Sequence, residues 1–278
     1  MATEQLQTRF QLLCSEITIV YDDPGLQLLL SYIALNARQN IPITAQWSYQ
    51  VRGTGPYEIY EEGDLFDQTN SLSDVQFHIY QRSYRRILDR YITAGWIALH
   101  AGIVQVAGQR MLLMGDKGAG KTTLTSRLLT SGHAVEGDEI ALVRRDDVMA
   151  CPRRLHIKPG IEKNVPALAP HLANLPTSIS SGVTIRALDP TVAGYAWNII
   201  SGPLDKIIYI APNHGGETTL EPLSTFNVLQ RLLENYLGWG QSKKQVRNYA
   251  MQLSRRDSFQ LNLGNAESAV TLLEALPR

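Results

Sequence analysis

Residues 115–122 read Gly115-Asp-Lys-Gly-Ala-Gly-Lys-Thr122 and follow the apolar run Met111-Leu-Leu-Met114. The stretch matches the pattern G-x-x-x-x-G-K-[ST] at every fixed position. In this pattern the glycines let backbone N–H groups turn toward phosphate oxygens, the lysine reaches the β- and γ-phosphates, and the hydroxyl coordinates Mg²⁺. An apolar strand before the loop and an amphipathic helix over 123–130 supply the context that the motif requires. We therefore predict a nucleotide triphosphate site here, with ATP and Mg²⁺ as cofactors and the choice between ATP and GTP left open.

The individual roles within the loop follow from the same pattern. Lys121 brings positive charge to the reacting phosphates, and Thr122 offers its hydroxyl to the metal ion. The positive N-terminal end of the helix that follows points at the same phosphates. The nucleotide contacts assigned on this basis are Gly115, Lys117, Gly118, Ala119, Gly120, Lys121, Thr122 and Thr123.

The composition is that of a globular protein without a charge bias. Of the 278 residues, 44% are hydrophobic, and 26 basic residues balance 26 acidic ones. A net charge of zero argues against a partner such as nucleic acid or an anionic membrane. Cys14 and Cys151 are isolated in the sequence and predict neither a disulfide framework nor a zinc site. The polar N-terminus lacks the apolar core of a signal peptide, and the expected location is cytoplasmic.

The chain is expected to form two parts. Residues 1–72 combine strand-like alternation with a helical stretch over 26–38 and indicate a small α+β region, in which the polar segment 64–73 is a loop. Residues 73–278 carry the phosphate loop. We expect further strands over 44–52, 57–60, 154–158, 197–200, 206–211 and 218–222, and helices over 224–237, 243–254 and 266–275.

A long helix is predicted from Asp74 to Thr93. Its apolar residues share one face, and its arginines cluster on the others. The arginines form either a solvated face or a patch for an acidic partner or a phosphate, and the sequence leaves both interpretations open. They are Arg82, Arg85, Arg86 and Arg90.

An acidic pair, Asp138-Glu139, lies sixteen residues after Thr122, just beyond the helix that follows the loop. A phosphate-loop enzyme needs a carboxylate near Mg²⁺, and this spacing differs from that of transport ATPases, whose Leu-Ser-Gly-Gly-Gln signature is absent from the sequence. The Asn-Lys-x-Asp motif of GTPases is absent as well. We expect Asp138, next to a metal ion and a lysine, to have a low pKa and to stay ionised.

Three elements in register resemble HPr kinase/phosphorylase and its related kinases. They are Leu99-His-Ala-Gly-Ile-Val-Gln-Val, Leu113-Met-Gly-Asp-Lys-Gly-Ala-Gly-Lys-Thr and Gly132-His-Ala-Val-Glu-Gly-Asp-Glu. The first run and Met111–Met114 enclose a turn and predict a β-hairpin in front of the loop. The resemblance implies an α/β fold with a phosphate-loop kinase core over 73–278, of the HPr kinase/PEP carboxykinase-like type, in which helices flank a mixed sheet.

The resemblance also implies roles for individual residues. Asp138 is the general base that takes the proton of an acceptor hydroxyl, and His100 orients or tunes that carboxylate, with Lys121 as the third catalytic residue. Thr122, Asp138 and Glu139 hold Mg²⁺, and Lys158 meets the transferred phosphate. The implied activity is that of a serine kinase, and the related enzymes form oligomers, so a homo-oligomer is an open option.

The sequence departs from the HPr enzyme in the segment Leu155-His-Ile-Lys-Pro-Gly160, where the family has Glu-Ile-Arg-Gly-x-Gly. Residues 1 to about 90 also lack a match to that enzyme's N-terminal domain. The resemblance therefore points to relatives that phosphorylate a Ser or Thr of a ribosomally made precursor peptide or small protein, with residues 1–72 as a recognition or dimer element. A small-molecule kinase and a nucleotide-responsive binding protein or ATPase without an acceptor remain alternatives. The irregular stretch 160–191 is the candidate lid for the acceptor.

Overall fold

Alternation of apolar and polar residues builds the sheet of the N-terminal part. In β4 the side chains of Trp47, Tyr49 and Val51 are buried, and the residues between them face outward. The strands have the order β1-β2-β4-β5-β6, with β2 and β4 parallel and the other neighbours antiparallel. The elements are β1 (Leu6–Leu12), β2 (Ser15–Tyr21), α1 (Leu26–Leu30), β3 (Arg38–Gln39), β4 (Ala45–Arg52), β5 (Tyr57–Glu61), β6 (Asp64–Thr69) and α2 (Leu72–Thr93).

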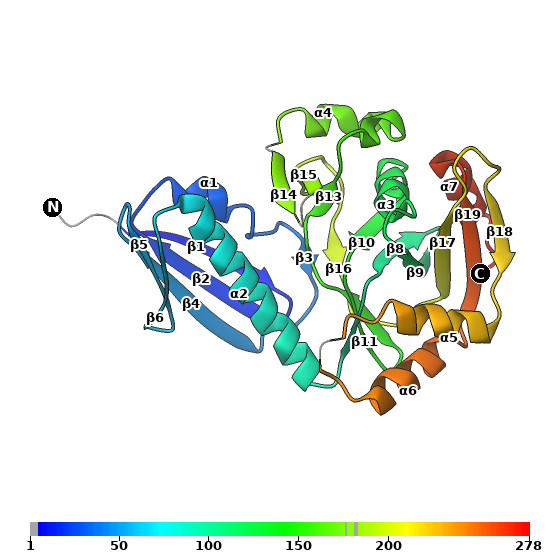
Figure 1. Ribbon diagram of the computed structural model, residues 1–278, viewed down its shortest axis with the longest axis horizontal. Helices are drawn as coiled ribbons and strands as arrows, with labels where there is room; N and C mark the ends of the chain where they lie inside the picture. The colour runs from blue at the N-terminus through cyan, green and yellow to red at the C-terminus, as the bar shows by residue number, and fades with distance from the viewer. Residues whose placement is uncertain (1–4, 176, 181–182, 239) are drawn as a thin grey trace. The chain divides into compact units, whose positions relative to one another are not determined.

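The computed structural model describes residues 5–175, 177–180, 183–238 and 240–278. The chain divides into two units, Met1–Thr93 and Ala94–Arg278 (Figure 1). The expected boundary between residues 72 and 73 differs from this division, because α2 belongs to the first unit. An amphipathic helix needs a partner for its apolar face, and α2 packs beside α1, β5 and β6.

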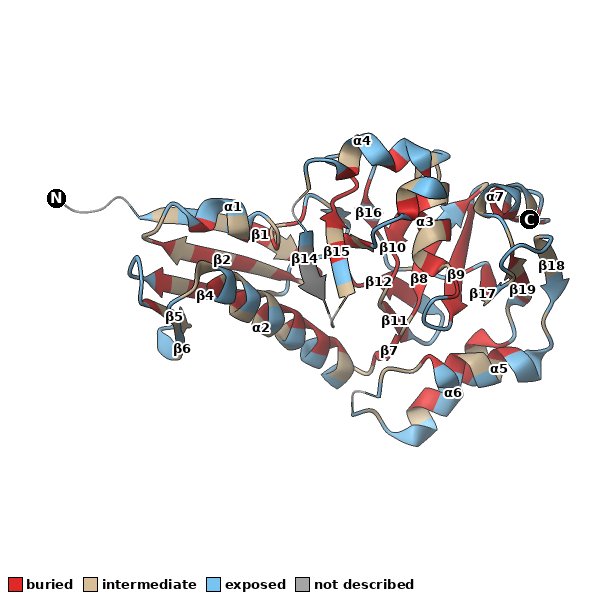
Figure 2. Cartoon of the chain, turned by 45° about the horizontal axis from the view of Figure 1, so that its top comes forward, coloured by how far each residue is buried: buried red, intermediate tan, exposed pale blue. Residues whose placement is uncertain are grey.

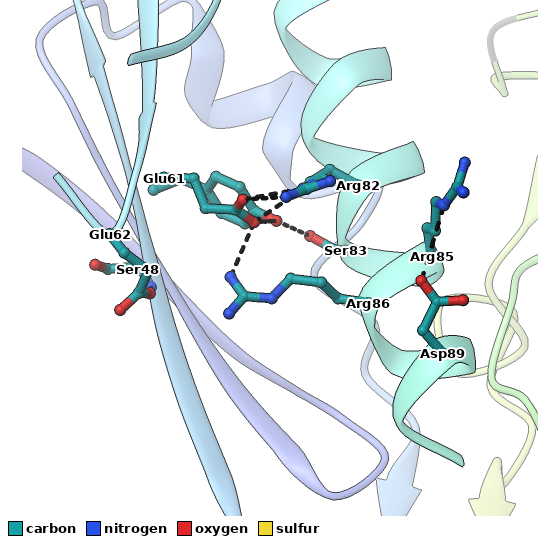
Figure 3. Close-up of polar contacts among 9 residues, drawn as sticks. Ser48, Glu61, Glu62, Arg82, Ser83, Arg85, Arg86 and Asp89 are labelled. Atoms are coloured by element: carbon teal, nitrogen blue, oxygen red, sulfur yellow. Dashed lines mark hydrogen bonds and ion pairs between the residues drawn. The ribbon is translucent and has the colours of Figure 1, made fainter. Parts of the chain in front are cut away.

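The arginines of α2 are engaged within the first unit. Arg82 and Arg86 both bind the carboxylate of Glu61 on β5, at 2.7 and 2.9 Å (Figure 3). Arg85 lies beside Asp89 one turn further on, at 3.8 Å. Of the two interpretations that the sequence left open, neither describes Arg82 and Arg86, which are ion-paired to a neighbouring strand.

Two expectations for the first unit are wrong. Residues 64–69 form the edge strand β6, which pairs with β5, because backbone hydrogen bonding between strands does not require apolar side chains. The helix expected over 26–38 ends at Leu30, and its last turn continues in 3₁₀-type bonds from Tyr32 and Ile33 to the carbonyl groups of Leu29 and Leu30.

The second unit is a mixed α/β structure, as expected. Its main sheet has the order β10-β8-β9-β17-β19-β18, in which β9, β17 and β19 are parallel and the remaining pairs antiparallel. A small sheet, β12-β11-β7, and a second one, β13-β15-β14, complete the unit. The strands are β7 (Ile97–Leu99), β8 (Gly102–Val106), β9 (Gln109–Gly115), β10 (Ala134–Gly137), β11 (Ala141–Arg144), β12 (Asp147–Ala150), β13 (Leu155–Ile157), β14 (Thr177–Ser180), β15 (Val183–Leu188), β16 (Asn198–Ile199), β17 (Lys206–Pro212), β18 (Thr219–Pro222) and β19 (Asp257–Leu263).

Helices cover both faces of the main sheet, as Figures 1 and 2 show. Apolar residues of α3 and α7 pack with those of β8, β9 and β17 in one core cluster. The helices α5 and α6 pack against each other on the opposite side of the sheet (Figure 2). The helical elements are α3 (Lys121–Thr130), η1 (Ile161–Lys163), η2 (Pro166–Leu168), α4 (Ala169–Leu172), α5 (Thr225–Glu234), α6 (Lys243–Leu253) and α7 (Ala266–Glu274). Over the described residues, no helix combines the length and the apolar character needed to cross a membrane.

Candidate active site

The phosphate-loop motif lies between a buried strand and a helix. Every residue of β9 is buried, and the strand ends at Gly115, six residues before α3 begins at Lys121. Gly115 packs so closely on β17 that an added Cβ would lie 2.8 Å from the carbonyl oxygen of Ile210. Gly118 and Gly120 have φ angles of +90° and +97°, which favour glycine. The strand, loop and helix expected around the motif are therefore present.

Lys121 is held at the base of the loop. Its ammonium group is largely buried and donates a hydrogen bond to the carbonyl oxygen of Gly115, at 3.2 Å. Burial lowers the pKa of Lys121, and the nearby carboxylates of Asp138 and Glu139 oppose that shift. An ammonium group has three N–H donors, so Lys121 can donate to an anion as well as to the carbonyl oxygen of Gly115.

Asp138 comes directly after β10 and faces the first turn of α3. Its carboxylate accepts a hydrogen bond from the Thr122 hydroxyl, at 3.2 Å. Burial, with the like charge of Glu139 second, raises the pKa of Asp138 to about 6. The expected low pKa is therefore wrong for the protein groups alone, because the cost of burying the carboxylate exceeds the effect of Lys121 and Thr122.

Close packing around a glycine fixes the backbone at Asp138. The predicted β-hairpin of β8 and β9 is confirmed, and β8 begins at Gly102. A Cβ at Gly102 would lie 2.9 Å from the Gly137 carbonyl oxygen and 3.1 Å from the Asp138 Cα. Gly102 thus lets the strand that carries Asp138 approach the hairpin.

His100 lies beside the acidic pair but contacts its backbone. The Nδ1 atom is 3.1 Å from the carbonyl oxygen of Glu139. A carbonyl oxygen only accepts, so Nδ1 carries the proton and Nε2 of the neutral ring remains an acceptor. Burial, followed by the charge of Lys121, lowers the pKa of His100. The structure brings His100 next to the proposed base, where it contacts the backbone of Glu139.

Glu139 is paired with a cation that the sequence did not single out. Its carboxylate lies 2.5 Å from the guanidinium of Arg153. Arg153 also reaches the Nδ1 atom of His156, at 3.2 Å, and burial together with the charge of Arg153 lowers the pKa of His156 to about 4. Glu139 and Asp138, adjacent in the sequence, therefore have different partners.

One cavity of about 510 Å³ gathers most of these residues. Of the residues assigned from the sequence, it is lined by His100, Lys117, Gly118, Gly120, Lys121, Thr122, Thr123, Asp138, Glu139 and Lys158. Gly115 and Ala119 are not part of the lining, because both are buried and Ala119 belongs to the core cluster. The volume falls within the range of small-molecule sites, roughly 300–1,000 Å³.

Another part of the cavity wall comes from the stretch expected to be a lid. Gly160, Ile161, Asn164, Val183 and Ile185 line it, next to Pro159 and the exposed Lys158. Much of this stretch is regular, since β15 pairs with β13 on one side and β14 on the other. Residues 176 and 181–182 of the expected lid lie outside the described residues. The apolar residues of this wall gave no motif in the sequence, because only pairing of β13 with β15 brings them to the loop.

The residues present fit a nucleotide with its metal ion. An added Cβ at Gly118 would meet no atom within 4 Å, so the loop faces open space. The Thr122 hydroxyl and the Asp138 carboxylate bring oxygen atoms close together. Proteins usually bind Mg²⁺ through one or two carboxylates together with substrate phosphates. Within the described ranges, no group of three or more His, Cys, Asp or Glu side chains forms a metal site by itself.

Comparisons with known proteins show a distant structural likeness. No protein-family model matches the sequence, and no curated protein matches it. Among solved structures, the chain is similar to the HPr(Ser) kinase/phosphatase from Coxiella burnetii, with 12% identity over 64% of this chain and 87% of that chain. The TM-score is 0.34, at which the likeness carries no argument about function. The chain is thus distantly similar to an HPr(Ser) kinase/phosphatase, and its activity is inferred from its own residues.

Proposed function

We propose that this protein is an ATP-dependent kinase that transfers the γ-phosphate to a hydroxyl group, that of a Ser or Thr in a peptide or small protein. The observation that carries the proposal is the 3.2 Å hydrogen bond between Thr122 and Asp138. It joins the end of the phosphate-loop motif to a buried carboxylate inside one cavity. That arrangement supplies a nucleotide site and a proton acceptor side by side.

Phosphate binding, metal binding and proton acceptance would fall to different groups of the chain. Backbone N–H groups of residues 117–121 and the Lys121 ammonium would hold the phosphates, and Thr122 with Asp138 would hold Mg²⁺. When bound, Mg²⁺ and ATP supply the phosphoryl group and neutralise the charge that develops on it. Asp138 would accept the proton of the acceptor hydroxyl at a carboxylate oxygen. A positioned base of this kind contributes about 10²–10⁴-fold.

The remaining assigned residues would support this arrangement. His100, neutral and donating from Nδ1 to the Glu139 carbonyl group, would fix the backbone beside the base. Glu139 would act first as the partner of Arg153 and, when it turns from that contact, as a second carboxylate for the metal ion. Lys158, exposed in the wall of the cavity, would meet the transferred phosphate. The peptide or small-protein acceptor rests on the sequence resemblance described above.

The proposal is tested by incubating the protein with γ-labelled ATP, Mg²⁺ and peptides encoded beside its gene. Transfer to a Ser or Thr is expected for the wild type, and Asp138→Asn should lose it while ATP without the metal ion still binds. The exposed hairpin residue Asp147 supplies the control variant Asp147→Asn. Wild-type transfer by Asp138→Asn would show that the base is misassigned. ATP binding without transfer to any hydroxyl would favour a nucleotide-responsive binding protein.

A further inference from the structure

A buried ion pair connects the strand before the phosphate loop to the strand that carries Asp138. Arg110 of β9 and Glu136 of β10 are 6% and 4% exposed. Two parallel hydrogen bonds join them, from Nε to Oε1 at 2.7 Å and from Nη2 to Oε2 at 2.8 Å. The two strands are not neighbours, since β8 lies between them in the sheet. The pair therefore spans a strand of the sheet.

Every donor of the Arg110 guanidinium is used. Besides the two bonds to Glu136, its Nη atoms donate to the carbonyl groups of Ile200, Gly202 and Pro203, at 2.9, 2.7 and 3.3 Å. A guanidinium has five N–H donors, and all five are accounted for. The backbone of Arg110 also exchanges bonds with Asp205. This geometry fixes the side chain in one place and leaves no donor for a ligand.

Glu136 sits at an irregularity in the sheet. Val135 pairs with Val104 of β8, but Gly137 and not Glu136 pairs with Ile103, so Glu136 is the extra residue of a β-bulge. A bulge changes the face to which the following side chains point. Asp138 follows two residues later and turns toward Thr122. The bulge thus decides the direction of the proposed base.

Side chains from two other segments hold that bulge. The Glu136 carboxylate is bound by Arg110, and its carbonyl oxygen accepts a hydrogen bond from Nε1 of the buried Trp197, at 2.9 Å. The carboxylate and the carbonyl oxygen of the extra residue are therefore both bound by residues outside its neighbouring strand. A bulge that leaves its ladder unpaired needs such partners when it is buried.

We propose that Arg110 and Trp197 are positioning residues that fix the bulge at Glu136 and so aim the Asp138 carboxylate into the cavity. The inference rests on the proposed phosphoryl transfer. Neither residue touches the reacting groups, and both act through Glu136. A displacement of about 1 Å at a reacting group can cost about 10²-fold in rate, so a modest relaxation of the bulge is enough to be measured.

The test separates positioning from stability with two kinds of variant. Arg110→Met with Glu136→Leu replaces the whole pair by apolar residues, a change that is often neutral for stability, whereas removing one partner strands a buried charge. Trp197→Phe removes the N–H donor together with part of the aromatic ring, and it is used if the double variant does not fold. The matched controls are Trp47→Phe, whose Nε1 has no hydrogen-bond partner in the described part of the first unit, and Lys206→Met, a buried cation that pairs with Asp257.

Two measurements are made on each folded variant. Amide hydrogen exchange of the free protein should become faster at residues 136–139 and stay unchanged at residues 111–115. The kcat for transfer from Mg²⁺·ATP should fall about 10- to 100-fold with an unchanged Kd for ATP measured without Mg²⁺, and the controls should keep wild-type values. Faster exchange together with lower kcat supports the proposal.

Other results would contradict the positioning proposal, and they can be distinguished from a failure of the kinase proposal. If amide exchange at residues 136–139 stays at the wild-type rate in the Arg110/Glu136 double variant or in Trp197→Phe, the bulge does not depend on Arg110 or Trp197. Faster exchange with a wild-type kcat shows that the pair is structural only. If the wild-type protein itself transfers no phosphate, the kinase proposal fails, and the exchange data on the free protein still decide whether Arg110 and Trp197 fix the bulge.

Discussion

The Glu139 carboxylate lies 2.5 Å from the Arg153 guanidinium, while its neighbour Asp138 accepts a hydrogen bond from Thr122. Two acids that are adjacent in the sequence therefore face different environments. Asp138 contacts the helix that follows the phosphate loop, and Glu139 is neutralised by a residue of a later segment. The difference supports the proposal that Asp138 is the base, and the charge of Arg153 lowers the pKa of Asp138.

Arg153→Gln should shift the acid limb of the pH–rate profile to higher pH. The charge of Arg153 lowers the pKa of Asp138, and its loss also leaves the like charge of Glu139 without a partner. Both effects raise the pKa of Asp138, so a higher pH is needed to ionise the base. The measurement is labelled phosphate transfer between about pH 5 and 8. Arg154→Gln is the control, because Arg154 lies beside Asp189, and an equal shift in both variants would argue against this role.

Asp138→Asn should stabilise the protein at high pH. The folded-state pKa of Asp138 is raised from 3.8 to about 6, so the contribution of this carboxyl group to stability is present below pH 3.8 and lost as the pH rises through 6. At pH 8 the ionised buried carboxylate costs up to about 3 kcal/mol, a cost that Asn removes. Urea unfolding at several pH values checks the prediction. The gain should shrink toward pH 4, and a variant less stable than wild type at pH 8 would contradict it.

Lys121→Met should abolish the thermal stabilisation by Mg²⁺·ATP. The buried Lys121 ammonium is the cation placed at the base of the loop. At a ligand concentration of about 100 Kd, binding stabilises a folded protein by about 2.7 kcal/mol, which a thermal melt detects. Lys244→Met on the exposed side of α6 should keep the full shift. An undiminished shift in Lys121→Met would place the nucleotide elsewhere.

Gly102→Ala should lower the transfer rate through the backbone at Asp138. The added Cβ would lie 2.9 Å from the Gly137 carbonyl oxygen, so the strand that carries the base must move. A reduction of about 10- to 100-fold in kcat is expected from a shift of this kind. At Gly202 the corresponding Cβ would meet Arg110 at an ordinary 3.9 Å, and Gly202→Ala is the matched control. If Gly102→Ala and Gly202→Ala lowered kcat equally, close packing at Gly102 would not explain the effect.

Local patterns predicted the elements around the loop. The buried run that ends at Gly115 and the hairpin before it could be predicted, because each depends on residues close in sequence. No expected element covers the strand β19, although it lies inside the sheet between β17 and β18. Its sequence, Asp-Ser-Phe-Gln-Leu-Asn-Leu, alternates apolar and polar residues from Phe259 to Leu263, and its pairing with a strand some fifty residues earlier gives it its place in the sheet.

The sequence alone determined that a phosphate-loop motif, a histidine and an acidic pair occur at a fixed spacing, since spacing is a property of the chain. Only the tertiary structure decided which acid contacts Thr122, how far burial raises its pKa, and which cation binds its neighbour. The bulge at Glu136 shows the reason. Its partners, Arg110 and Trp197, lie 26 residues before it and 61 residues after it, and only folding brings them together.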